Sequence, residues 1–186
     1  DDVEFLKCKD WNTGTIPNHR SNSNNSLICN DITKLDDTYW DSFYNDSEVL
    51  GLINLNLCRT KGRIKDGNNM VDADVEGVNP CGEIPLRDRG TCCLTELFLS
   101  NIENYEEMKD VATLLYRICK HSISLPCHQK TTEEVVHKDM RIGVGITGFA
   151  QATEEQKGWL SDLYEYLREY DIEYSKKHNF SPSVKL

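Results

Sequence analysis

The second half of the chain alternates strand-like apolar runs with helices that carry their own start signals. Residues 93–99 are apolar enough for a buried strand, and the glycine-rich stretch 143–148 is typical of a second strand or a tight turn. Asn104 followed by Glu107 predicts the start of an amphipathic helix that runs through His121. Strands that alternate with helices over this length indicate an α/β fold.

Two further helix starts are predicted after this helix. Thr131 with Glu134 and Thr153 with Gln156 repeat the pattern of a hydroxyl side chain followed three residues later by Glu or Gln. The last of them predicts one long helix, whose apolar stripe is Leu160, Leu163, Leu167, Tyr170 and Tyr174. This spacing makes the tyrosines packing or surface residues.

The first half of the chain is more polar and predicts shorter elements. The segment up to about residue 30 is rich in Asn and Ser and indicates loop, with one short strand near residues 26–29. Residues 35–44 carry apolar side chains at helical spacing, whereas residues 52–57 fit a strand or an extended turn. Residues 61–77 are polar and glycine-containing, so we expect a loop there.

Composition limits what the chain can bind and where it can work. A chain of 186 residues is long enough for one domain with a real core, and a net charge of -10 argues against a nucleic-acid-binding surface. The sequence has neither a membrane-length apolar run nor the basic and apolar regions of a secretory signal, so we expect no membrane partner and a cytoplasmic setting. In that setting the eight cysteines are expected to be reduced thiols.

A five-residue motif places an amide, a thiol and a carboxylate close together. Asn79, Cys81 and Glu83 alternate along the chain, and an extended backbone would point all three toward one substrate. Pro80 stiffens the loop and Gly82 permits close approach. A carboxylate beside a thiol can accept a proton from a substrate hydroxyl. For a lone Cys-x-Glu the simpler interpretation is a turn with a buried cysteine and a solvated glutamate.

The motif continues as NPCGEIPL and is followed by Cys92 and Leu94, and this pattern resembles the active-site loop of ribonucleotide reductases, most closely the adenosylcobalamin-dependent (class II) enzymes. Supporting segments occur in the same order along the chain: RSNSNNSL at 20–27, GLINLNLCRTKGR at 51–63, RIGVGITGF at 141–149, and residues 166–183. The resemblance implies part of the ten-stranded α/β barrel of these enzymes, with a finger loop that carries the radical cysteine. Residues 1–186 would then form a single partial catalytic-barrel domain, as a fragment, an extein-like half or one subunit of a split enzyme.

The resemblance also assigns roles to individual residues. Cys81 is implied to be the thiyl-radical site that abstracts the ribose 3′-hydrogen of a ribonucleotide, and Glu83 to deprotonate the 3′-hydroxyl. Asn79 is implied to hydrogen-bond the ribose hydroxyls. Cys92, rather than Cys93, is implied to be one of two thiols that supply the reducing equivalents. Adenosylcobalamin is the implied cofactor, and a thioredoxin-like reductant and the rest of the reductase, or a second copy of this chain, are the implied partners.

Four short polar residues are weaker candidates for substrate binding. Ser23, Asn24, Asn25 and Ser26 cluster at the start of an expected strand, where such side chains can line a substrate site. A simple Asx-rich turn is the alternative.

Other signals are weak, and two other functions remain open. The GVGITG stretch at 143–148 matches a dinucleotide-binding pattern, but the residues before it are polar and charged. Cys127 and His128 lack the partner spacing of a zinc site, so we expect no protein-ligated metal. The alternative functions are a class I-type large-subunit fragment that uses a radical generated by a partner subunit, and a non-catalytic thiol-rich interaction module.

Overall fold

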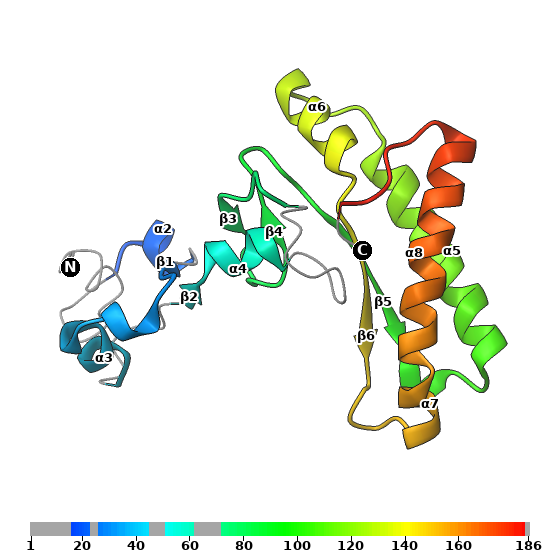
Figure 1. Cartoon of the computed structure of the whole chain (residues 1–186), viewed down its shortest axis with the longest axis horizontal. Helices are drawn as coiled ribbons and strands as arrows, with labels where there is room; N and C mark the ends of the chain where they lie inside the picture. The colour runs from blue at the N-terminus through cyan, green and yellow to red at the C-terminus, as the bar shows by residue number, and fades with distance from the viewer. Residues whose placement is uncertain (1–15, 23–25, 45–50, 62–71, 185–186) are drawn as a thin grey trace. The chain divides into compact units, whose positions relative to one another are not determined.

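The computed structural model describes residues 16–22, 26–44, 51–61 and 72–184. They belong to two compact units, Asp1–Asp88 and Arg89–Leu186 (Figure 1). The candidate loop around Cys81 lies in the first unit and Cys92 lies in the second. None of the helices that the structure describes combines the length and the apolar character needed to cross a lipid bilayer.

The second unit repeats the order strand, helix, strand, helix. Its main elements are β5 (Cys93–Phe98), α5 (Tyr105–Ile123), α6 (Lys130–Asp139), β6 (Ile142–Thr147), α7 (Glu154–Gly158) and α8 (Leu160–His178), with a short 3-10 helix, η3 (Leu99–Asn101), after β5. β5 and β6 pair in parallel from Cys93 opposite Ile142 to Phe98 opposite Thr147. The expected α/β arrangement is therefore present, and of the strand or tight turn expected at 143–148 the structure has the strand.

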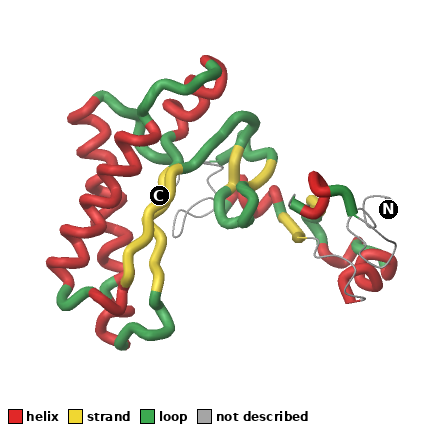
Figure 2. Tube along the Cα trace, turned by 180° about the vertical axis from the view of Figure 1, so that it is seen from behind, coloured by secondary structure: helices red, strands yellow, loops and turns green. Residues whose placement is uncertain are grey.

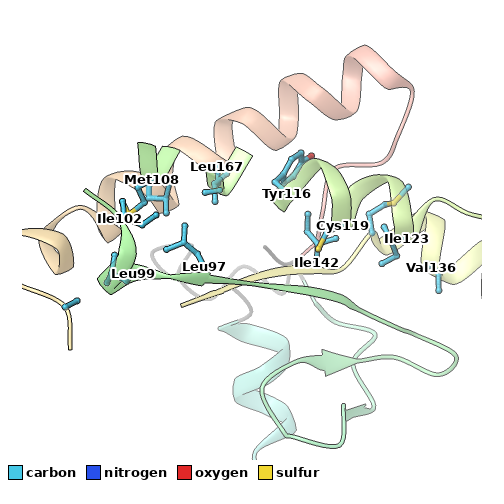
Figure 3. Close-up of a cluster of buried hydrophobic side chains, with 14 residues drawn as sticks. Leu97, Leu99, Ile102, Met108, Tyr116, Cys119, Ile123, Val136, Ile142 and Leu167 are labelled. Carbon is cyan, nitrogen blue, oxygen red and sulfur yellow. The ribbon is translucent and has the colours of Figure 1, made fainter. Parts of the chain in front are cut away.

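Helices α5 and α8 cover one face of the β5–β6 sheet (Figure 2). The core lies between the helices and this face and includes Leu97, Leu99, Met108, Tyr116, Cys119, Ile142, Leu163 and Leu167 (Figure 3). On the other face the large side chains of Leu94 and Phe98 are exposed in this unit. The sheet is thus buried on one side only.

Two of the three predicted helix starts are confirmed. Asn104 caps α5 by accepting a hydrogen bond from Glu107 N at 3.0 Å, and Thr153 and Gln156 form the expected capping box of α7. The expected cap at Thr131 is wrong: α6 begins at Lys130 after Gln129, with no side-chain cap. The single long helix expected from Thr153 is also interrupted at Trp159, where α7 ends and α8 begins.

A buried charged network joins α5, α8 and the segment that follows α8. Asp171 on α8 accepts hydrogen bonds from Lys120 Nζ at 2.7 Å and from the Tyr116 hydroxyl at 2.6 Å, both on α5. Its second oxygen accepts from Ser183 N at 2.7 Å, and Lys120 also donates to Ser181 O at 2.8 Å. The network therefore fixes where the chain runs after α8.

The first unit contains short elements and little core. They are α2 (Asn18–Ser21), β1 (Ser26–Ile28), η2 (Ile32–Lys34), α3 (Asp37–Tyr44), β2 (Gly51–Ile53), α4 (Leu55–Thr60), β3 (Gly77–Val78) and β4 (Pro85–Leu86). β1 pairs with β2 in parallel, and β3 pairs with β4 as an antiparallel hairpin. The expected strand or extended turn at 52–57 is only partly correct, because Asn54 accepts a hydrogen bond from Leu57 N and starts α4 there.

Candidate active site

The candidate motif forms the loop of the β3–β4 hairpin. Its base is closed by hydrogen bonds from Glu76 N to Leu86 O at 2.9 Å and from Asn79 N to Ile84 O at 3.0 Å. Beside this base, Arg87 forms an ion pair of 2.7 Å with Asp74. The loop from Asn79 to Ile84 is therefore held at both ends.

A β-turn at the start of this loop places Cys81 at the tip. Gly82 N donates to Asn79 O at 2.9 Å, which closes the turn with Pro80 and Cys81 at its two central positions. Gly82 has φ +85°, a left-handed conformation that glycine adopts without strain. The thiol of Cys81 is exposed. The turn thus presents the thiol to whatever binds outside the loop.

The extended backbone expected between Asn79 and Glu83 is wrong, although these side chains do meet. The turn brings Asn79 Nδ2 to within 2.5 Å of Glu83 Oε1, and Asn79 Oδ1 accepts from Ile84 N at 2.9 Å. Asn79 is buried, whereas Glu83 is exposed. The amide is therefore buried in the loop, whereas the carboxylate that it holds is exposed.

The sequence analysis missed this internal use of Asn79. The signal was present, because Asn at the start of a turn commonly bonds the backbone a few residues ahead. The simpler interpretation, a turn with a buried cysteine and a solvated glutamate, is wrong for Cys81, which is exposed as Glu83 is. An exposed thiol and a fixed carboxylate can act on one bound substrate.

A cavity of about 450 Å³ lies against the hairpin within the first unit. Its walls come from Asn22, from β1 and β2, from Leu55 and from the segment 76–80, which includes Asn79. Ser26 lines this cavity, so one of the four weaker candidates does lie near the motif. Ser23, Asn24 and Asn25 are outside the described residues.

Cys92 directly precedes β5 in the second unit and is half-buried. Its neighbour Cys93 packs against the core beneath α5. Cys93 is also half-buried, but successive residues of an extended chain point to opposite faces, so the packing of Cys93 against the core favours Cys92 as the cysteine that can reach a substrate. That Cys92 and Cys81 act in one active site stays a prediction.

The Cys119 thiol, unlike that of Cys81, is buried and unreactive. It is fully buried on α5, donates to Thr95 Oγ1 at 3.6 Å, and its pKa is raised to about 11 by burial and by the neighbouring Cys93. Such a thiol stays protonated and inert at neutral pH. Across the described ranges, no group of three or more His, Cys, Asp or Glu side chains is arranged to hold a metal ion.

Comparison with known proteins relates the chain to one group of enzymes. The family model described as the ribonucleotide reductase barrel domain matches residues 60–162. The adenosylcobalamin-dependent ribonucleoside-triphosphate reductase of Lactobacillus acidophilus is 30% identical over 217 residues, which cover 100% of this chain and 29% of that protein. The enzyme of the same name from Lactobacillus leichmannii is 33% identical over 150 residues, or 80% of this chain and 20% of that protein.

A solved structure agrees with these relatives. The crystal structure of a B-12 dependent (class II) ribonucleotide reductase matches with a TM-score of 0.80 and 25% sequence identity, over 100% of this chain and 30% of that one. The chain thus spans less than a third of the length of these proteins.

Proposed function

The chain belongs to the ribonucleotide reductase family, and on that premise we propose that it carries part of the catalytic barrel of an adenosylcobalamin-dependent enzyme that reduces ribonucleoside triphosphates to 2′-deoxyribonucleotides. The observation that carries this proposal is the hairpin loop, which exposes Cys81 at its turn and holds the carboxylate of Glu83 through Asn79. The triphosphate substrate is taken from the names of the relatives. Activity requires the remaining parts of the reductase.

Within the loop, each side chain has a distinct task. When bound, adenosylcobalamin would supply the radical chemistry that removes the hydrogen atom of the Cys81 thiol, and the exposure of Cys81 fits a group that must be reached from outside the loop. The Cys81 radical then abstracts the 3′-hydrogen of the ribose. Glu83 accepts the proton of the 3′-hydroxyl, and the 2′-hydroxyl takes a proton from the reducing thiol pair and leaves as water. Asn79, whose amide holds Glu83, hydrogen-bonds the ribose hydroxyls.

The reduction itself needs two electrons from a pair of thiols. Cys92 supplies one of these thiols, and the second comes from another part of the reductase. The pair closes into a disulfide in each turnover, and a thioredoxin-like dithiol reopens it by exchange. Ser26, with Ser23, Asn24 and Asn25, would contribute to the substrate side of the first unit.

The cofactor requirement tests this proposal against the class I-type alternative. We expect the full-length reductase that contains this chain to form deoxynucleotide from ribonucleoside triphosphate only when adenosylcobalamin and a dithiol are both supplied. Cys81→Ser should abolish turnover, because a hydroxyl hydrogen is too strongly bound to be abstracted by the same oxidant.

Cys58→Ser is the matched control, since Cys58 lies on α4, outside the hairpin loop. It should keep most of the activity. Turnover without the cofactor, or turnover of Cys81→Ser near that of the control, would contradict the proposal.

A single-domain organisation and a cytoplasmic setting, in which the cysteines stay reduced, belong to the same proposal.

A further inference from the structure

The cavity beside the β3–β4 hairpin has an apolar floor. Ile28 and Ile53 are opposite each other in the parallel pairing of β1 with β2, so their side chains lie next to each other on one face of the pair, and both residues line the cavity. Leu55, at the start of α4, lines it as well. Ile28 is 55% exposed. These residues form an apolar surface on which a flat ring can pack.

The polar residues that line the cavity include no cationic residue among those that the structure describes. They are Asn22, Ser26, Glu76 and Asn79. The amide of Asn79 holds Glu83 and is assigned to the ribose in the proposed function. An amide, a hydroxyl and a carboxylate, those of Asn22, Ser26 and Glu76, are therefore the groups that can meet another part of a ligand.

This lining disfavours a phosphate and favours an uncharged ring. Triphosphates are bound by Arg, Lys or converging N–H donors, and the carboxylate of Glu76 would repel one. A neutral nitrogen heterocycle can instead pack its face on the isoleucines, while an amino group on its edge donates to that carboxylate. The cavity volume of about 450 Å³ lies within the range of about 300–1,000 Å³ that is typical of small-molecule sites.

We propose that this cavity binds the base of the nucleotide substrate, and that Glu76 is a specificity-determining residue that accepts a hydrogen bond from an amino group of the base. The inference rests on the proposed function, which assigns the ribose to Asn79, another residue of the cavity wall. The triphosphate then lies outside the cavity. The adenosyl group of the cofactor carries the same kind of ring, so the experiment has a separate arm for each source.

Glu76→Gln in the full-length reductase tests the specificity. CTP and UTP have rings of the same size, but cytosine carries an amino group where uracil carries a carbonyl oxygen, which a carboxylate repels. Glutamine accepts from the amino group and also donates to the carbonyl oxygen. We therefore expect the ratio of kcat/KM for CTP to kcat/KM for UTP to fall about 10-fold. Glu106→Gln, at an exposed position on α5, is the matched control and should leave the ratio unchanged.

Gly77 allows the cavity to be filled from its own wall. A Cβ at this position meets nothing within 4 Å, and the backbone conformation is one that other residues adopt without strain. Gly77→Leu should raise both the KM and the equilibrium Kd for CTP at least about 10-fold, because the leucine occupies the space of the base. Gly77→Ala should raise them less and keeps the test decisive if leucine opens the hairpin. Gly158→Leu, at a glycine of α7 with equally open surroundings, is the control.

The second arm measures cofactor binding without turnover. Adenosylcobalamin carries the adenosyl group and hydroxocobalamin lacks it, so a cavity that held the adenosyl ring would make Gly77→Leu raise the Kd of the first and not of the second. That result would overturn the assignment to the substrate. An unchanged ratio in Glu76→Gln, or an unchanged Kd for CTP in Gly77→Leu, would also overturn the inference. If instead Cys81→Ser still turned over, the proposed function would fail, while the Kd of CTP would still report on the cavity.

Discussion

The two units of the chain treat their cysteines in opposite ways. In the first unit Cys81 is exposed at the tip of a loop held by a few local hydrogen bonds. In the second unit Cys119 is fully buried between a parallel sheet and a helix, where the low polarity raises its pKa to about 11. The same side chain is therefore available for chemistry in one unit and serves packing in the other.

The loop that carries Cys81 lies outside the large hydrophobic core cluster. The buried apolar side chains that form the large core cluster belong to the second unit, whereas Tyr39 anchors a small cluster in the first. The hairpin instead depends on Asn79, whose side chain joins two points of the loop. We expect variants of the second unit to change stability, and variants of the hairpin to change activity.

The largest stability effect should come from the charged network of the second unit. Asp171→Ala removes the acceptor of Lys120, Tyr116 and Ser183 N and leaves the Lys120 ammonium buried without its carboxylate. Breaking a buried pair in this way costs about 3–5 kcal/mol. Urea unfolding followed by circular dichroism measures it. Glu169→Ala, an exposed position on the same helix, should stay within about 0.5 kcal/mol of wild type, and an equal effect of both variants would contradict the expectation.

Alkaline pH should weaken the second unit through Cys119. Its pKa rises from 9.0 to about 11 on folding, so the folded state keeps a proton that the unfolded state releases. The corresponding stability is fully present below pH 9 and is lost as the pH rises to about 11. This difference in pKa corresponds to a loss of about 2–3 kcal/mol of stability at high pH.

The pH effect is isolated by comparing the wild type with Cys119→Ala. Other groups, among them Lys120, whose pKa is lowered by burial, also respond to alkali and cancel in this difference. We expect the free-energy gap between the two proteins to be constant up to about pH 9 and to narrow above it. A gap that stays constant to pH 11 would show that the Cys119 thiol ionises normally.

The elements that the sequence predicted well are those set by neighbouring residues. Asn104 caps α5 and Thr153 caps α7 through residues three positions ahead, so the signal is complete within one turn of helix. The break at Trp159 was not predicted, because the start signal at Thr153 and the apolar stripe that begins at Leu160 are both typical of helix, and Gly158 is the one breaker between them. Local patterns therefore identify helices better than they identify interruptions.

The contact between Asn79 and Glu83 was predicted without its geometry. The two side chains do meet, yet a turn with Pro80 and Cys81 at its centre, not an extended strand, brings them together. The buried pair of Lys120 with Asp171 was not predicted at all, since its partners are 51 positions apart and each is an ordinary charged residue in the sequence. Such long-range pairs depend on how α5 and α8 pack.

The adjacent cysteines at the start of β5 provide a smaller and more selective test. Cys93 packs against the core, so Cys93→Ser should cost about 1 kcal/mol of stability and leave turnover nearly unchanged. Cys92→Ser should leave stability nearly unchanged but stop multiple turnover of the full-length reductase with dithiol reductants. Mass-spectrometric mapping after turnover should find Cys92 in the disulfide. Finding Cys93 there instead would reverse the assignment.

The smallest effect concerns two glycines of the second unit. A Cβ at Gly145 on β6 would fall on the carboxylate of Glu96, which lies across β6 and accepts a hydrogen bond from Thr147 at 2.7 Å. Because the end of a glutamate side chain can move aside, Gly145→Ala should cost only about 0.5 kcal/mol, mainly the lost Thr147 bond.

At Gly158 a Cβ meets nothing within 4 Å, so Gly158→Ala should instead stabilise the unit by about 0.5 kcal/mol, as expected for a helix. In a Glu96→Ala background the Gly145→Ala change should also become stabilising, because the obstacle is gone and glycine no longer lowers the stability of the strand. Urea unfolding of the single and double variants measures both signs, and a Gly145→Ala cost that persists without the Glu96 carboxylate would show that the sheet backbone itself requires glycine there.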